Sequence, residues 1–177
     1  MKMANGELLN FHQGYRLGLF LPLFIFIYGL FEFLYFKIPD VFLIDVMYHY
    51  GLVLPCAAII NFLHSGEQVM AARNILSANG VSLEVVRGCD GAGTIFLLAA
   101  AIISFSASLK DKFFGLLSGI TLLVIINLIR IIGLYFVMAY YEPWFVPIHT
   151  YFAPSFIIIL NCLFFAGWAQ RVTNKTP

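Results

Sequence analysis

Long apolar runs constrain the fold of this chain more than any other feature of its sequence. Each run suits a helix that crosses a membrane, because a hydrocarbon core about 30 Å thick requires roughly 20 apolar residues. The expected spans are Leu17–Phe36, Val41–Leu63, Ala92–Leu109, Phe113–Tyr141 and Tyr151–Ala169. The sequence therefore predicts an all-α polytopic bundle of about five transmembrane helices, in a single integral membrane domain over residues 1–177.

The composition agrees with a chain that is solvated by lipid. Hydrophobic residues make up 62% of the sequence and charged residues 11%, whereas about 25% of a soluble domain is charged. A net charge of +1 provides no basic surface for nucleic acid. The three cysteines, Cys56, Cys89 and Cys162, lack the spacing of a metal motif. The bilayer is the expected partner, and neither a metal nor another cofactor is expected.

The second run is the most ambiguous of the five. It contains Asp45, His49 and Pro55, so it is either a tilted membrane helix or a re-entrant piece. Asp45 and His49 lie four residues apart and share a helix face. Two ligands make a weak case for a metal site, and solvated residues at the membrane interface are the favoured interpretation.

The longest polar segment, Ser65–Asp90, precedes the third run. Its first half, Glu67–Ala78, has apolar residues at helical spacing, which predicts a surface helix. Asn79-Gly80 is a turn signal, and Val81–Val85 alternates as a strand does. The sequence therefore predicts a short helix–turn–strand segment outside the membrane.

Basic residues indicate the orientation of the last three spans. Lys110 and Lys112 join the third and fourth spans, and Arg171 and Lys175 follow the fifth, whereas the loop Glu142–Thr150 contains no lysine or arginine. By the positive-inside rule the basic ends are cytoplasmic. The start of the third span then faces outward, and so does the N-terminus if all five spans cross.

Arg130 is an anomaly, because a charge within a membrane span is costly and usually faces the protein interior or a wet cavity. It either serves function, which is the favoured interpretation, or snorkels to the interface or pairs with an acid such as Glu32. From Phe113 to Arg130 the helix rises about 26 Å at 1.5 Å per residue. Arg130 should therefore lie near the outer face, at the depth of Cys89 and His149.

These three side chains suit nucleophilic catalysis. A thiol beside a helix N-terminus and a cation is favoured as the thiolate, which is the nucleophile. His149 would act as the base, and Arg130 would stabilise an oxyanion or hold a carboxylate. Asp90, next to Cys89, opposes thiolate formation.

Three further residues are predicted to support this site. Gly88 and Gly91 flank the Cys89-Asp90 pair and allow a tight turn and the close approach of a substrate backbone. Asn127 lies three residues before Arg130, shares its helix face, and would donate a hydrogen bond nearby.

The same residues resemble a known family. The stretch Glu67–Leu98 is similar to the region that leads into the active cysteine of exosortases and archaeosortases, and Asn127-Leu-Ile-Arg130 resembles their Asn-x-x-Arg helix. His149 falls where exosortases have their histidine. The resemblance covers residues 65–170, and the N-terminal spans in residues 1–64 carry no motif.

The resemblance implies a membrane-embedded cysteine transpeptidase or protease in a bacterial plasma (inner) membrane, with its active site on the extracytoplasmic side. Its substrates would be exported proteins with a C-terminal sorting tail: a short motif, a transmembrane helix and a basic end. Cys89 would be the nucleophile, Arg130 the cation that positions the oxyanion or substrate, and His149 the acid and base.

The chain departs from the family pattern in two respects. Many members have Cys-Ser-Gly where this chain has Cys89-Asp90-Gly91, and larger members have about eight spans. Two other functions compete with the one that the resemblance implies. A small transporter or channel would use Arg130 and His149 in a polar path, and a membrane assembly subunit would have no catalytic residues.

Overall fold

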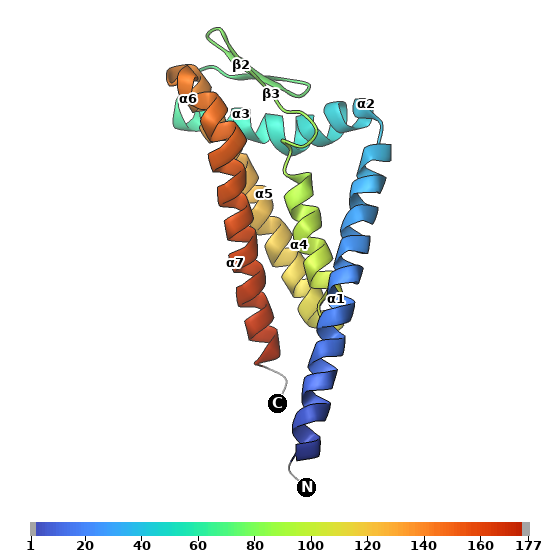
Figure 1. Ribbon diagram of the computed structural model, residues 1–177. Coiled ribbons are helices and arrows are strands. Elements are labelled where there is room, and N and C mark those ends of the chain that lie inside the picture. The colour runs from blue at the N-terminus through green and yellow to red at the C-terminus, as the bar shows by residue number, and fades with distance from the viewer. Residues whose placement is uncertain (1–2, 175–177) are drawn as a thin grey trace.

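Four helices run side by side and form the body of the molecule (Figure 1). The structure, a computed structural model, describes residues 3–174, with side chains from residue 18 onward. The four helices are α1 (Met3–Lys37), α4 (Ala92–Ser104), α5 (Leu109–Tyr140) and α7 (Ala153–Thr173). Because α4 packs against each of the other three, it forms the centre of the bundle. The prediction of an all-α polytopic bundle is confirmed.

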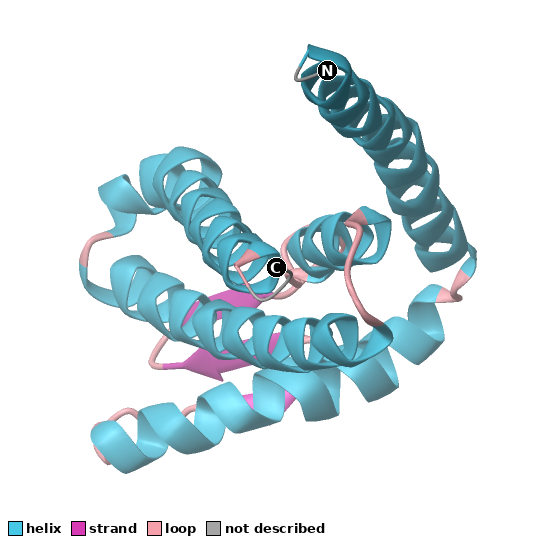
Figure 2. Ribbon diagram, turned by 90° about the horizontal axis from the view of Figure 1, so that it is seen from below, coloured by secondary structure: helices cyan, strands magenta, loops and turns pink. Residues whose placement is uncertain are grey.

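The second apolar run crosses the end of this bundle instead of joining it. It folds as α2 (Asp40–Phe42), a π-helix η1 (Leu43–Val53) and α3 (Leu54–Leu63), which follow one another in a single rod. Figures 1 and 2 show the rod at a steep angle to the four bundle helices. Hydropathy reports how apolar a helix is and not its direction, which explains why the sequence left this segment ambiguous.

The number of spans is lower than expected. Four helical segments within the described residues are long and apolar enough to cross a membrane: Gly18–Lys37, Asp40–Leu63, Leu109–Tyr140 and Glu142–Thr173. The third expected span ends early, because Phe105 takes an extended conformation (ψ 142°) after Ser104. At 13 residues, α4 is about 20 Å long, so it is shorter than a full crossing.

This arrangement brings both ends of the chain to one end of the bundle. Figure 1 shows the N-terminal end of α1 and the C-terminal end of α7 at the end opposite to the rod. The loop between α4 and α5 lies at the same end, and Lys110 follows it in the first turn of α5. The five crossings that would put the N-terminus on the other side are not found, and the start of α1 lies at the same end as Lys110 and Arg171. Lys175 lies outside the described residues.

A three-stranded antiparallel sheet replaces the helix that we predicted over Glu67–Ala78. The strands are β1 (Met70–Ala72), β2 (Ile75–Ala78) and β3 (Val81–Glu84), in that order across the sheet. Arg73 and Asn79 have left-handed φ angles of 53° and 51°, which interrupt a helix and form the two turns.

The helical spacing was misleading because only part of the apolar set reaches the core. Leu76 and Leu83 are opposite each other in the register of β2 and β3 and are buried. They join Ile131, Leu134 and Tyr135 of α5 in one cluster, so burial against α5 fixes which face of the sheet points inward. The predicted turn at Asn79-Gly80 and the strand that begins at Val81 are confirmed.

A buried carboxylate attaches the start of this sheet to the end of α5. Glu67 is 7% exposed. It accepts hydrogen bonds from Tyr135 Oη at 2.8 Å and from Tyr140 Oη. The bonds from Tyr140 and Tyr135 hold the pKa of Glu67 below its ordinary value. The folded state therefore favours the ionised carboxylate.

Removing one of these hydrogen-bond donors should make the thermal stability of the protein less dependent on pH. Because the pKa of Glu67 is lowered on folding, its contribution is present above the unfolded-state pKa and is lost as the pH falls through the folded-state value. We expect Tyr140→Phe to lower the Tm at about pH 7, and the difference from wild type to narrow towards about pH 3. The neighbouring Tyr141→Phe is the control. A constant difference across this range would contradict the assignment.

Candidate active site

Two glycines with left-handed backbone place Cys89 directly before α4. Gly88 has a φ of 89° and Gly91, the N-cap residue of α4, has a φ of 86°. Between them the N–H of Cys89 donates to the carbonyl of Val86 at 2.9 Å. These conformations suit glycine because a Cβ atom penalises them. The thiol therefore lies at the positive end of the α4 dipole.

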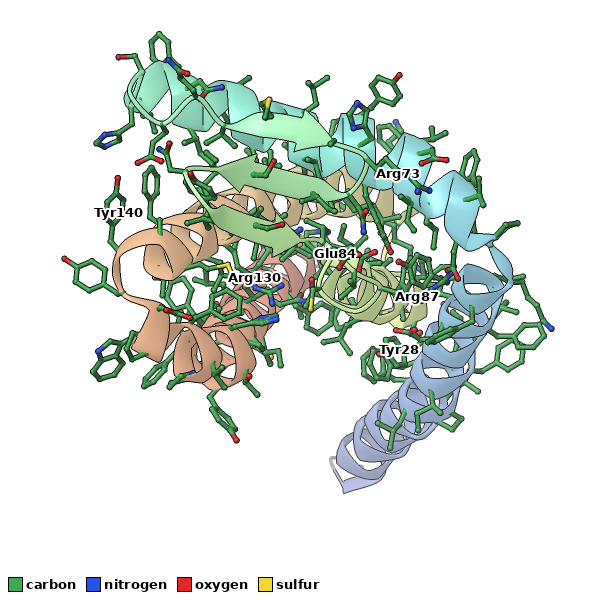
Figure 3. The ribbon with its side chains drawn as sticks, turned by 90° about the horizontal axis from the view of Figure 1, so that it is seen from above. Tyr28, Arg73, Glu84, Arg87, Arg130 and Tyr140 are labelled. Atoms are coloured by element: carbon green, nitrogen blue, oxygen red, sulfur yellow. The ribbon has the colours of Figure 1, made fainter. Side chains whose placement is uncertain are left out.

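The structure brings Cys89, Arg130 and His149 together from three segments. Cys89 Sγ lies 3.5 Å from His149 Nε2. His149 belongs to the short π-helix η2 (Ile148–Phe152), which links α6 (Glu142–Pro147) to α7. Arg130, on α5, donates from Nη1 to the carbonyl oxygen of Cys89 at 3.2 Å. Viewed from above, Arg130 lies between the sheet and the α6–α7 corner (Figure 3).

Two nitrogen atoms of this cluster are buried and have no partner among the described residues. They are Arg130 Nε and His149 Nδ1. The imidazole thus contacts the thiol through one nitrogen, while no described carboxylate orients it through the other. The guanidinium holds the Cys89 main chain and keeps further N–H donors for another acceptor. This is a thiol–imidazole pair with an adjacent cation, a set that suits nucleophilic attack on a carbonyl.

Asn127 supports the turn that carries the thiol. It is 3% exposed, and its Nδ2 donates to the carbonyl of Asp90 at 2.7 Å. A Cβ atom built on Gly91 would lie 2.8 Å from Asn127 Cγ. Gly91 is thus required by its φ angle and by the close approach of Asn127. Gly88, by contrast, has open space around it.

The structure shows where the carboxylate next to the thiol is held. Tyr35 Oη, on α1, donates to Asp90 Oδ2, and the hydroxyl of Tyr48 lies 2.7 Å from that of Tyr35. The other carboxylate oxygen accepts the N–H of Ala92 at 3.4 Å, within the first turn of α4. Asp90 is therefore engaged on the α1 side, whereas the Cys89 sulfur contacts η2.

Sequence reasoning missed the role of Arg87. Its guanidinium donates to the carbonyls of Tyr35 (2.7 Å) and Ile38 (3.0 Å) at the end of α1, and pairs with Asp40 at 2.6 Å. The hydrogen bond to Asp40 raises the pKa of Arg87. Arg87 thus anchors the segment before Cys89 to α1. A charge two residues before a candidate nucleophile was the available signal, although its partners lie about 50 residues earlier.

A cavity of about 440 Å³ adjoins the site between α1, α4 and α7. Gly88, Asp90 and Arg130 connect it to the cluster, and Glu32 enters it from α1. Glu32 and Arg130 are not within ion-pair distance among the described side chains, so the structure gives Arg130 no carboxylate partner of this kind. The lining also includes five apolar side chains: Phe36, Leu97, Pro154, Ile157 and Ile158.

Asp45 and His49 lie away from this site and share a different neighbour. Asp45 accepts from Arg73 Nε at 2.8 Å, and His49 Nδ1 lies 3.0 Å from the Arg73 carbonyl. Both therefore hold the β1–β2 turn against η1. Within the described part of the chain, no group of three or more potential ligands could hold a metal ion.

Comparison with known proteins identifies the family. No curated protein matches the chain, and no solved structure does. A family model described as transmembrane exosortase matches residues 24–168. That match includes α4, α5 and the segments that carry the thiol, the guanidinium and the imidazole. The chain is therefore a multi-pass membrane protein that belongs to the transmembrane exosortase family.

Proposed function

We propose that this protein is a cysteine peptidase or transpeptidase that removes C-terminal sorting tails from exported proteins. The observation that carries the proposal is the distance of 3.5 Å between Cys89 Sγ and His149 Nε2, with Arg130 bound to the same cysteine. Family membership supports a role on exported proteins. The catalytic roles of these three residues are our assignment.

In the first half-reaction, Cys89 forms a thioester with the substrate. His149 Nε2 accepts the thiol proton as Sγ attacks the carbonyl carbon of the scissile peptide bond. The tetrahedral intermediate collapses when the C–N bond breaks, and His149 returns the proton to the leaving amine. The tail departs with a free amino group, and the exported protein remains bound to Cys89 as a thioester.

Arg130 would stabilise the oxyanion of that intermediate. Its Nη1 already contacts the carbonyl of Cys89, and its buried Nε has no partner among the described residues. Preorganised donors beside a developing oxyanion typically contribute 10²–10³-fold to the rate of an acyl transfer. An immobile guanidinium suits this task, since it requires no reorganisation during the reaction.

The second half-reaction resolves the thioester. His149 Nε2 removes a proton from the incoming nucleophile, either water or an amine of an acceptor molecule, as that nucleophile attacks the thioester carbonyl. The C–S bond breaks and the Cys89 thiolate regains a proton. The product is a shortened protein that ends in a carboxylate or in an amide bond to the acceptor.

The cavity gives the tail a route to the thiol. The apolar lining from α1, α4 and α7 suits a transmembrane helix that arrives from the lipid, and Gly88, Asp90 and Arg130 connect the lining to the catalytic cluster. Arg171, in the last turn of α7, and Lys110, in the first turn of α5, lie at the opposite end of the bundle. By the positive-inside rule the site then faces the extracytoplasmic side of the plasma (inner) membrane.

Trapping with hydroxylamine tests the thioester. Hydroxylamine added to cells or membranes should intercept the acyl-enzyme, so that processed exported proteins end in a hydroxamate. Mass spectrometry of C-terminal peptides detects this group. The Cys162→Ala variant should give the same hydroxamates, because Cys162 is exposed on α7 and has no contact with the cluster. Processing that continues without any hydroxamate would rule out a thioester intermediate.

A further inference from the structure

The free edge of β3 leads directly to the candidate nucleophile. β3 is the last strand of the sheet in the order β1-β2-β3, so one of its edges has no neighbouring strand. The chain passes from Glu84, the end of β3, through a tight turn to Cys89. In the view from above, β3 is the strand nearest to the α6–α7 corner, with Arg130 between them (Figure 3).

The register shows which backbone groups face this edge. The N–H of Val85 donates to the carbonyl of Asn74 at 2.8 Å. In an antiparallel pair, hydrogen-bonded and non-hydrogen-bonded residues alternate. Val81 and Leu83 therefore bond to β2, whereas Ser82 and Glu84 direct their N–H and C=O groups outward. No backbone hydrogen bond to these outward groups occurs in residues 3–174, and both residues are exposed.

The end of this edge is held in place. Asn74 is buried, and its Nδ2 donates to the carbonyl of Val85 at 2.9 Å and to Glu84 Oε1 at 3.0 Å. Arg87 then anchors the following residues to the end of α1. The strand edge and the thiol are thus parts of one fixed segment, attached on both sides. A row of unpaired donors and acceptors on a rigid strand is a template for an added strand.

We propose that the substrate segment on the N-terminal side of the scissile bond binds to the β3 edge as an added strand. This inference rests on the proposed function, because it assumes a peptide substrate that acylates Cys89. The acyl portion ends at Cys89, and β3 also runs towards Cys89, so the two strands are parallel. One substrate residue lies opposite Leu83: its N–H donates to the carbonyl of Ser82, and its carbonyl accepts the N–H of Glu84. The substrate residues on either side of it direct their N–H groups away from β3.

Main-chain recognition of this kind has a consequence for specificity. The β3 edge would accept many sequences, because each residue offers the same N–H and C=O groups. Discrimination would then depend on side-chain contacts elsewhere, such as the cavity with Glu32 and Arg130.

N-methylation of a peptide probe tests the added strand. The purified full-length Cys162→Ala protein is treated with acetyl-tetra-alanyl vinyl sulfone and with the same peptide N-methylated at each residue in turn. Intact-mass spectrometry follows modification of Cys89, since Cys56 is fully buried. We expect methylation at the residue that pairs with Ser82 and Glu84 to slow the reaction roughly tenfold, the effect of one or two hydrogen bonds. Methylation at its neighbours should change little.

A proline variant tests the same contact from the side of the protein. Glu84→Pro removes the outward N–H that bonds the carbonyl of the paired substrate residue and should slow the peptide probe roughly tenfold, while iodoacetamide, which is too small to reach the edge, reacts as before. Ala71→Pro removes an outward N–H from the opposite edge of the sheet, in β1, and is the matched control.

The outcomes separate this inference from the proposed function. Equal rates for all the methylated probes, or a peptide probe no faster than iodoacetamide, would overturn the added strand and leave the nucleophile intact. If Glu84→Pro fails to fold, the probe series on the parent protein still decides. A Cys89 that reacts with none of the reagents would overturn the proposed function, and the added strand with it.

Discussion

Cells that produce the Cys89→Ala protein should accumulate exported proteins with intact C-terminal tails. We expect processing to fall at least about a thousandfold, because removing the nucleophile of such a catalytic unit abolishes the covalent route and leaves only binding and oxyanion stabilisation. Cys89→Ser should be nearly as inactive, since a hydroxyl is a much weaker nucleophile in a site built for a thiol. Mass spectrometry of C-terminal peptides measures the ratio of full-length to shortened protein.

The controls for this experiment come from the same chain. Cys162→Ala should process normally, and the abundance and thermal stability of all variants in detergent should match wild type. His149→Ala should lower processing by about 10²–10⁴-fold, the usual contribution of a general acid–base, whereas His64→Ala should not, because His64 packs edge-on against Phe136 and has no contact with the thiol. Normal processing by Cys89→Ala would refute the mechanism.

Adding Arg130→Ala to this set of variants distinguishes the competing functions. A transporter or channel that used Arg130 and His149 in a polar path would depend on Arg130 and be indifferent to Cys89. An assembly subunit would tolerate substitution of Arg130 and of Cys89. Joint dependence on Cys89, Arg130 and His149 is expected only of catalysis.

Gly91→Ala should be among the most destabilising single methyl additions in this protein. A left-handed conformation costs a non-glycine residue about 1–2 kcal/mol, and Gly91 has a φ of 86°. The added Cβ would also lie 2.8 Å from Asn127 Cγ, and overpacking of this kind costs about 1–3 kcal/mol. Together these effects predict a loss of roughly 2–5 kcal/mol in the free energy of unfolding, measured by denaturation of the protein in detergent.

Gly88→Ala separates the two contributions. Gly88 has a φ of 89° and no atom within 4 Å of an added Cβ, so it should lose only the backbone cost of about 1–2 kcal/mol. Combining Gly91→Ala with Asn127→Ala should cost less than the sum of the single changes, because the contact between the two side chains is then absent. Equal losses for Gly88→Ala and Gly91→Ala would show that Asn127 leaves room for a methyl group.

The bundle helices could be predicted from the sequence because their apolar runs are long. The depth of Arg130, and thus its approach to Cys89 and His149, followed from the rise of a helix and the thickness of a bilayer. The sheet could not be predicted, since strands of three or four residues carry little periodicity, and the burial of Leu76 and Leu83 depends on α5. The direction of the rod could not be predicted either, because an apolar helix has the same hydropathy whether it spans a membrane or crosses the end of a bundle.

The environment of the thiol depends on contacts between residues that lie far apart in the sequence. Tyr35 holds the Asp90 carboxylate from 55 residues away, so the effect of the acidic neighbour could not be judged from adjacency alone. Arg87 attaches the segment that carries Cys89 to α1, and its partners could not be identified from the sequence. Both contacts involve α1, the part of the chain without a recognisable motif.

Under the proposed function, the rod formed by α2, η1 and α3 also bears on which tails could reach Cys89. Five large apolar side chains of the rod are exposed: Val41, Phe42, Val46, Met47 and Tyr50. They suit a helix that lies in the headgroup region of the bilayer and fixes the depth of the protein in the membrane. This placement of the rod would hold Cys89, which directly precedes α4, at one depth in the membrane. If the basic end of a sorting tail stays at the cytoplasmic face, as the proposed function requires, the length of the tail's hydrophobic stretch would decide whether the scissile bond reaches the thiol.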